Sequence, residues 1–238
     1  MNAEYPLMGL SSLFPPVLVI TARLRNLLAP WYSRWHAQHY ESKRQGKRWQ
    51  SETKAFRLLY RQVDPQRVLD CPVGTGRWFE EYQEHGASVL GIDLSKDMLA
   101  EAARKIRPGA KIALKQADVL AAARLDLGSG YDLIVCTRFV HWLRLPDVKA
   151  LIAGFASTGS RFLLLGARVK SDAPGPARAA RRSWSARLRH ALTFSHVHDE
   201  KELLEILTER GWKLIERARI GRGGSWIYFF YLLRRSQP

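Results

Sequence analysis

Cysteine is scarce in this chain, since only Cys71 and Cys136 occur among its 238 residues and no C-x-x-C pair is present. This scarcity excludes a disulfide-rich secreted domain and a zinc finger, and it is typical of a protein in a reducing cytoplasm. Long apolar runs are also lacking. The apolar stretch at residues 13–20 is short, is broken by Pro15 and Pro16, and follows no basic segment. It predicts neither a signal peptide nor a membrane span.

Acidic residues are few relative to basic ones: 22 Asp and Glu stand against 38 Lys and Arg, which gives a net charge of +16. Such a surplus indicates an anionic partner, which can be a nucleic acid, a phosphorylated glycan or lipid, or an acidic membrane surface. Hydrophobic residues make up 46% and charged residues 25%, close to globular averages, which excludes wholesale disorder. We expect one α/β domain over residues 50–238, preceded by a helical arm at residues 1–49.

The strongest motif is a glycine loop between two predicted strands. Val68-Leu69-Asp70 runs into Cys-Pro-Val-Gly-Thr-Gly, which ends at Gly76, and Asp93 comes directly after the strand that follows. Glycines allow a tight turn and close approach of a ligand to the backbone, and Asp93 lies 93 − 70 = 23 residues beyond Asp70. That spacing is typical of a second-strand carboxylate that binds a ribose. The motif therefore indicates a nucleoside-containing cofactor.

The third glycine of a dinucleotide site is absent, because Phe79 stands in its place. We expect the Asp70 carboxylate at the mouth of the loop, where it would repel phosphates and suit an ammonium or sulfonium group. Here the chain resembles the class I S-adenosylmethionine-dependent methyltransferases over roughly residues 50–235. One departure is Pro72, which stands where the family usually has its first glycine. The resemblance implies a Rossmann-like fold, with a mostly parallel central sheet flanked by helices and a C-terminal antiparallel β-hairpin.

Local patterns predict an alternating succession of strands and helices. Strands are expected at 67–70, 88–92, 111–116, 131–136 and 161–169, with a C-terminal pair at 213–220 and 226–233. Helices are expected at 31–62, divided at Gly46, and at 77–85, 96–106 and 147–155. Ser95 and Asp199 are predicted N-caps, the latter with Glu202 in a capping box that opens a helix ending at Gly211.

The resemblance also implies a set of cofactor-binding residues. Asp70, Gly74 and Gly76 would hold the methionyl end, and Asp93 would bind the ribose hydroxyls. Asp118 and Val119 would bind the adenine edge. Leu94 and Met98 would form apolar walls, with a core position as the alternative for Met98. Arg77 would pair either with the cofactor carboxylate or with Asp70, and both alternatives stay open. The full expected set is Asp70, Pro72, Gly74, Gly76, Arg77, Asp93, Leu94, Met98, Asp118, Val119 and Thr137.

Acceptor-binding residues are expected after the fourth strand, since open α/β sheets place substrates at the carboxyl ends of their strands. Arg138 and Trp142 lie there, and His141 is the candidate general base because imidazole titrates near neutrality. A packed helix-start residue is the alternative for His141. The segment lacks the [Asp/Asn/Ser]-Pro-Pro-[Tyr/Phe] pattern of enzymes that methylate base amines, and no Pro-Cys nucleophile occurs. Both absences count against nucleobase chemistry.

Residues 170–198 resemble a basic insertion that opens with Pro174-Gly175-Pro176. Its apolar positions Trp184, Leu188 and Leu192 are spaced four apart, which predicts a basic amphipathic helix. Arginines cover its other faces: Arg178, Arg181, Arg182, Arg187 and Arg189. We expect Arg181, Arg182 and Trp184 to contact the acceptor, with a solvated helix packed on the domain as the alternative. His196 and His198 alternate on a strand-like stretch, and His190 lies nearby in sequence. Because no third ligand stands at a clear spacing from this pair, no metal site is predicted.

The sequence thus predicts a cytoplasmic S-adenosyl-L-methionine-dependent methyltransferase. Its expected acceptor is an anionic small molecule, glycan or lipid-linked sugar that is methylated on oxygen or nitrogen. An RNA methyltransferase and a non-catalytic cofactor-binding protein remain as alternatives, with nucleic acid not favoured as the partner. Residues 1–35 could pack on their own domain, mediate dimerisation, or bind the inner face of a membrane with Arg23 and Arg25 toward the headgroups.

Overall fold

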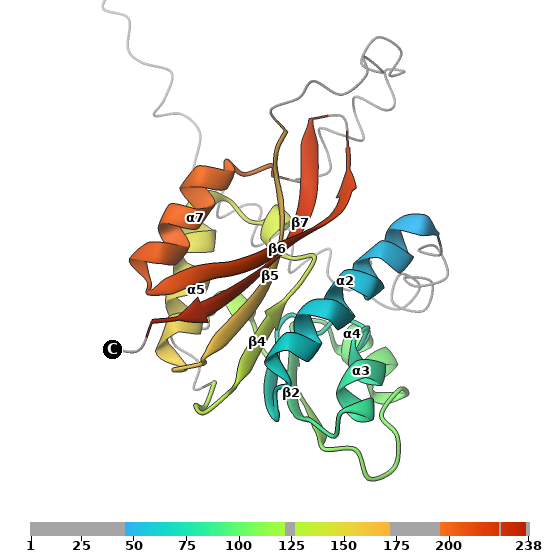
Figure 1. Ribbon diagram of the computed structural model, residues 1–238. Coiled ribbons are helices and arrows are strands. Elements are labelled where there is room, and N and C mark those ends of the chain that lie inside the picture. The colour runs from blue at the N-terminus through green and yellow to red at the C-terminus, as the bar shows by residue number, and fades with distance from the viewer. Residues whose placement is uncertain (1–45, 122–126, 172–195, 224, 237–238) are drawn as a thin grey trace, which may run out of the picture.

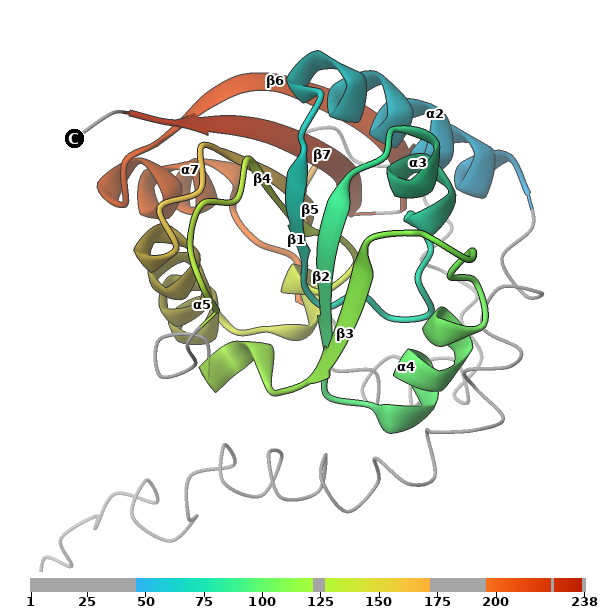
Figure 2. The same cartoon turned by 90° about the horizontal axis from the view of Figure 1, so that it is seen from below.

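The computed structural model describes residues 46–121, 127–171, 196–223 and 225–236. Over these residues the chain forms a seven-stranded sheet in the order β3-β2-β1-β4-β5-β7-β6 (Figures 1 and 2). The strands are β1 Arg67–Asp70, β2 Ser88–Asp93, β3 Ile112–Gln116, β4 Leu133–Cys136, β5 Phe162–Lys170, β6 Trp212–Arg222 and β7 Trp226–Arg235. The first five are mutually parallel, and β7 runs antiparallel between β5 and β6. The predicted Rossmann-like sheet with its antiparallel C-terminal pair is confirmed.

Helices cover both faces of the sheet, as Figure 2 shows. They are α2 Lys47–Val63, α3 Phe79–Glu84, α4 Lys96–Ala103, α5 Leu145–Ser157 and α7 Glu200–Glu209, with short 3₁₀ turns at Val119–Ala121 and Val140–Trp142. On one face, α5 and α7 bury Leu151, Phe155 and Leu203 against the sheet. On the other, α2 and α3 bury Phe56 and Tyr82. None of the helices in the described ranges is both long and apolar enough to cross a membrane.

Short-range capping signals determine several helix ends. The Ser95 hydroxyl accepts a hydrogen bond from the Met98 N–H, and Asp199 accepts from the Lys201 and Glu202 N–H groups, so both predicted caps are confirmed. Two helices are shorter than expected. Helix α3 begins at Phe79 rather than at Arg77, because residues 74–78 still belong to the turns of the glycine loop, and α4 ends at Ala103 rather than at residue 106.

The strand order reverses direction at the β1–β4 pair, since the chain steps outward from β1 to β3 and then returns to β4. In open α/β sheets the crevice outside the carboxyl ends of the strands at such a point is where ligands bind. The segments that follow β1 and β4 are the glycine loop and residues 137–142, which carry about half of the predicted site residues. The site is therefore built around this switch point.

Candidate functional site

The glycine loop after β1 is held in place by the end of β2. The Val73 N–H donates to the Ile92 carbonyl at 2.8 Å, and the Gly74 N–H donates to Asp93 Oδ2 at 2.9 Å. Asp93 Oδ1 accepts from the Ser95 N–H at 2.9 Å, so one carboxylate joins the loop to the start of α4. Burial raises the pKa of Asp93, and these N–H hydrogen bonds oppose the rise.

The two loop glycines serve different purposes. Both have positive φ, 57° at Gly74 and 68° at Gly76. A Cβ at Gly74 would meet no atom within 4 Å, whereas one at Gly76 would lie 2.7 Å from the Phe79 ring. Phe79 therefore occupies the space beneath Gly76, while the outer face of Gly74 is open to a ligand.

Asp70 does not lie at the mouth of the loop, and that expectation was wrong. Its side chain is buried, and Oδ2 accepts a hydrogen bond from the Tyr82 hydroxyl at 3.0 Å. Burial raises the pKa of Asp70 to about 8, the nearby Asp93 carboxylate adds to the rise, and the Tyr82 hydrogen bond opposes it. A pKa near 8 favours the protonated form of Asp70 at neutral pH, and a protonated Asp70 repels phosphate less than the sequence suggested.

The carboxyl ends of β2 and β3 carry the residues expected around the adenine. Leu94 is an exposed apolar side chain next to Asp93, and Asp118 is exposed as well. Asp118 Oδ1 accepts from the Leu120 N–H at 2.9 Å, so Asp118 also shapes the local turn. Met98 on α4 and Val119 in the first 3₁₀ turn are both buried. The roles of Leu94, Met98, Asp118 and Val119 toward an adenine stay predictions.

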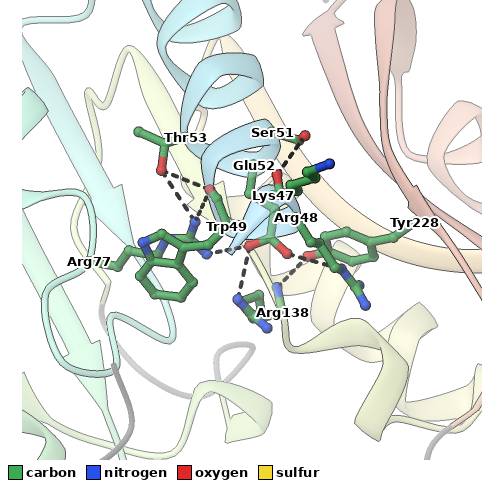
Figure 3. A network of polar contacts seen from close by, with 9 residues as sticks. All are labelled: Lys47, Arg48, Trp49, Ser51, Glu52, Thr53, Arg77, Arg138 and Tyr228. Atoms are coloured by element: carbon green, nitrogen blue, oxygen red, sulfur yellow. Dashed lines mark hydrogen bonds and ion pairs between the residues drawn. The ribbon is translucent and has the colours of Figure 1, made fainter. Parts of the chain in front are cut away.

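A buried carboxylate on α2, Glu52, joins the cofactor loop to the segment after β4 (Figure 3). Glu52 is 1% exposed, and its Oε2 accepts from Arg77 and, at 2.9 Å, from Arg138. Glu52 Oε1 lies 3.5 Å from Arg48 Nε. Among the described residues these ion pairs gather three guanidinium groups on one carboxylate, so the group carries 3 − 1 = +2 charges.

Arg77 pairs with Glu52 and not with Asp70, so the second alternative for Arg77 was wrong. The Arg77 guanidinium carbon lies 3.4 Å from the centroid of the Trp49 ring and 4.2 Å from that of Trp78. Stacking on these two rings directs the Arg77 side chain toward α2. The Tyr82 hydroxyl, and not Arg77, donates the hydrogen bond to Asp70. Burial lowers the pKa of Arg77, and Glu52 opposes this effect. A role of Arg77 toward a cofactor carboxylate stays a prediction.

The segment after β4 is packed tightly. The Thr137 hydroxyl accepts from Trp78 Nε1 at 3.0 Å, which connects β4 to the glycine loop. His141 is buried, with its ring centroid 5.0 Å from that of Trp142 and 6.4 Å from that of Tyr228. Trp142 is 37% exposed and is available to a ligand. Both the catalytic and the packing interpretation of His141 stay open.

The two described ends of the basic insertion lie close to His141. The His196 N–H donates to the His141 carbonyl at 2.7 Å, and His198 Nε2 lies 3.0 Å from the Val140 carbonyl. Lys170 N–H donates to the His198 carbonyl, so the insertion leaves and rejoins the domain at the carboxyl end of β5. Arg181, Arg182 and Trp184 themselves lie outside the described residues, as do His190 and residues 1–45 of the arm predicted at residues 1–49. No cluster of metal-ligating side chains occurs among the residues described.

Sequence reasoning missed the residues that surround Arg138, above all Glu52, Arg48 and Tyr228. A signal for Glu52 was present, because it occupies the apolar face of α2 at helical spacing with Phe56, Leu59 and Tyr60. A carboxylate at such a position is buried only with a partner.

Fold and site together are typical of a Rossmann-like domain that binds a nucleoside-containing cofactor through a glycine loop and a second-strand carboxylate. Residues 68–158 match the family model described as methyltransferase domain. This match and the fold identify a methyltransferase domain, in agreement with the resemblance to the class I S-adenosylmethionine-dependent methyltransferases. The cofactor of such a domain is S-adenosyl-L-methionine, which supplies an electrophilic methyl group when bound.

Known proteins similar to this chain include enzymes that methylate oxygen and enzymes that methylate nitrogen. The magnesium-protoporphyrin O-methyltransferase of Synechocystis sp. is 24% identical over 177 residues, 70% of each chain. The structure of magnesium protoporphyrin IX methyltransferase from Synechocystis superposes with a TM-score of 0.60 at 20% identity, over 79% of this chain and 83% of that one. The 1,6-didemethyltoxoflavin-N1-methyltransferase of Burkholderia thailandensis gives a TM-score of 0.62 at 18% identity, over 99% and 94% of the two chains.

Proposed function

We propose that this methyltransferase acts on an oxygen or nitrogen atom of an anionic acceptor: a small molecule, a glycan or a lipid-linked compound. The observation that carries the proposal is the surplus of positive charge at the acceptor edge. Glu52 balances only one of the three guanidinium groups around it, and Arg138 comes from the segment after β4. Positive charge beside the carboxyl ends of the strands attracts an anion to the place where substrates bind.

The basic insertion supports the same acceptor class. Its described ends, Ser171 and His196, lie at the carboxyl end of β5 and beside His141. The segment between them contains Arg178, Arg181, Arg182, Arg187 and Arg189. If it contributes to capture, replacing Arg181 and Arg182 with Gln raises the acceptor KM far more than it changes cofactor affinity, because charges at a rim act mainly on encounter.

Methyl transfer needs mainly the correct alignment of the acceptor with the methyl group. A general base is required only when the acceptor atom must lose a proton, and His141 is then the candidate on this edge. Both chemistries are found among the similar proteins, since the Synechocystis relative is named an O-methyltransferase and the Burkholderia structure is named an N1-methyltransferase. The proposal therefore includes both oxygen and nitrogen as the acceptor atom.

Product analysis tests the proposal directly. The full-length protein is incubated with methyl-deuterated S-adenosyl-L-methionine and with separate pools of anionic metabolites, neutral metabolites, glycans and lipids, and RNA. We expect products that gain the mass of one labelled methyl group only among anionic acceptors. Label in RNA would replace this proposal with the RNA methyltransferase alternative. Cofactor binding without turnover on any pool would favour a non-catalytic binding protein.

A further inference from the structure

The cationic group around Glu52 continues into a row of basic and aromatic side chains. The Arg48 guanidinium carbon lies 4.9 Å from the ring centroid of Trp226 and 5.4 Å from that of Tyr228. On β5, the Arg168 guanidinium carbon lies 4.7 Å from the Trp226 ring centroid. The row joins α2, β7 and β5 and lies next to Arg138 at the carboxyl edge (Figure 3 draws its Arg48, Arg138 and Tyr228 end).

Only part of this row is accessible to a ligand. The Arg77 side chain is 8% exposed and is enclosed by Trp49 and Trp78, whereas Arg138 is 21% and Arg48 is 41% exposed. Arg48 and Arg138 are therefore partly exposed to solvent, while one nitrogen of each lies against Glu52. A planar guanidinium held in this way can donate its remaining N–H groups to a second oxyanion.

A second arginine cluster in the same protein provides a comparison. On the outer side of α2, Arg57 contacts both Glu80 and Glu81, and Arg61 contacts Glu81 as well. Two guanidinium groups there meet two carboxylates, so that cluster is neutral without a ligand. The Glu52 cluster has three guanidinium groups and one carboxylate, so it has a surplus of charge that an anion can balance.

The backbone at Arg138 is held in an unusual conformation by its neighbours. Arg138 has φ 60°, a left-handed value that non-glycine residues rarely adopt. Its N–H donates to the Tyr228 hydroxyl at 2.9 Å, and that hydroxyl lies over Gly166 of β5, where a Cβ would be only 2.4 Å away. Strained backbone of this kind persists where surrounding contacts enforce it, commonly at ligand sites.

We infer that Arg48 and Arg138 form the binding site for an oxyanion group carried by the acceptor, a carboxylate or a phosphate ester. Glu52 is the positioning residue that holds the two guanidinium groups, and the Trp226 and Tyr228 rings lie against Arg48. This inference rests on the proposed function and deepens it, because it assigns the negative charge of the acceptor to two named side chains. Arg77, on the glycine-loop side of Glu52, is left to the cofactor.

Binding of simple anions tests the site without knowledge of the natural acceptor. Benzoate and phenyl phosphate serve as anionic probes and benzamide as the neutral counterpart, each titrated calorimetrically into full-length protein saturated with S-adenosylhomocysteine at constant ionic strength. We expect one or both anions to bind more tightly than benzamide, and Arg48→Gln/Arg138→Gln to weaken that binding at least tenfold. The tighter of the two anions identifies the acceptor group as a carboxylate or a phosphate.

The matched control is Arg104→Gln/Arg107→Gln, which removes the same charge from exposed residues that follow α4. Equal anion binding by the two double variants would overturn the inference. A tenfold loss of S-adenosylhomocysteine affinity in the Arg48/Arg138 variant would also overturn it, because it would assign these side chains to the cofactor. If the double variant does not fold, Arg48→Gln alone is used, since it leaves Glu52 paired with Arg77 and Arg138. Failure of the proposed function is seen in a different experiment, the product analysis, where no methyl group would be transferred to the pool of anionic metabolites.

Discussion

Replacing Glu52 by Gln removes the charge that holds the three arginines together while keeping nearly the same side-chain volume. Glu52 is 1% exposed and accepts hydrogen bonds from Arg77 and Arg138, with Arg48 at 3.5 Å. In the variant three guanidinium groups repel one another with no carboxylate between them. Removing one partner of a buried ion pair costs about 3–5 kcal/mol. Arg48 and Arg138 are partly solvated, so we expect a loss near the lower end, about 3 kcal/mol.

Equilibrium unfolding in urea at pH 7 measures this loss. For a protein of this size, about 3 kcal/mol corresponds to a fall in Tm of roughly 6–12 °C. Because the variant retains uncompensated cations, added phosphate should raise its Tm more than it raises that of the wild type. Glu205→Gln is the control, because Glu205 is 60% exposed, lies 3.9 Å from Lys201, and should change stability by less than about 0.5 kcal/mol. A Glu52→Gln variant as stable as this control, with an ordinary response to phosphate, would refute the reasoning.

Three further predictions concern the predicted site residues. Asp93→Ala should weaken S-adenosylhomocysteine binding by about 1.5–3 kcal/mol in calorimetry, and unchanged affinity would exclude Asp93 from the ribose site. The pKa of Asp70 is about 8 in the folded protein and about 3.9 when unfolded, so this group's contribution to stability declines as pH rises from about 4 to 8. Asp70→Asn should flatten that part of the pH profile of urea unfolding, and an unaltered slope would contradict the assignment. If His141 is the general base, His141→Gln should lower kcat by about 10²–10⁴-fold and abolish the acidic limb of the pH–rate profile, whereas a change within fivefold would leave His141 a packing residue.

The sequence by itself determined the parts of the protein that depend on neighbours along the chain. Strand β1 lies at the predicted residues, and β2 extends one residue past its predicted end to include Asp93. The caps at Ser95 and Asp199 were readable because each side chain bonds to an N–H two or three residues later. The antiparallel C-terminal strands were predicted from two β-rich runs around Gly-Arg-Gly-Gly together with the family resemblance.

Only the tertiary structure decided which partner each charged side chain takes. Arg77 meets Glu52, which lies 25 residues earlier, and Arg138 meets the same carboxylate across 86 residues. Asp70 was placed correctly at the end of β1, but its burial and its bond to Tyr82 depend on how α3 packs over the loop. Hydrogen bonds and ion pairs are short-ranged and act between whichever groups the packed elements bring together. Spacing along the chain therefore predicts the loop and its acids, whereas the surplus charge at the acceptor edge follows from the way α2, β4 and β7 meet.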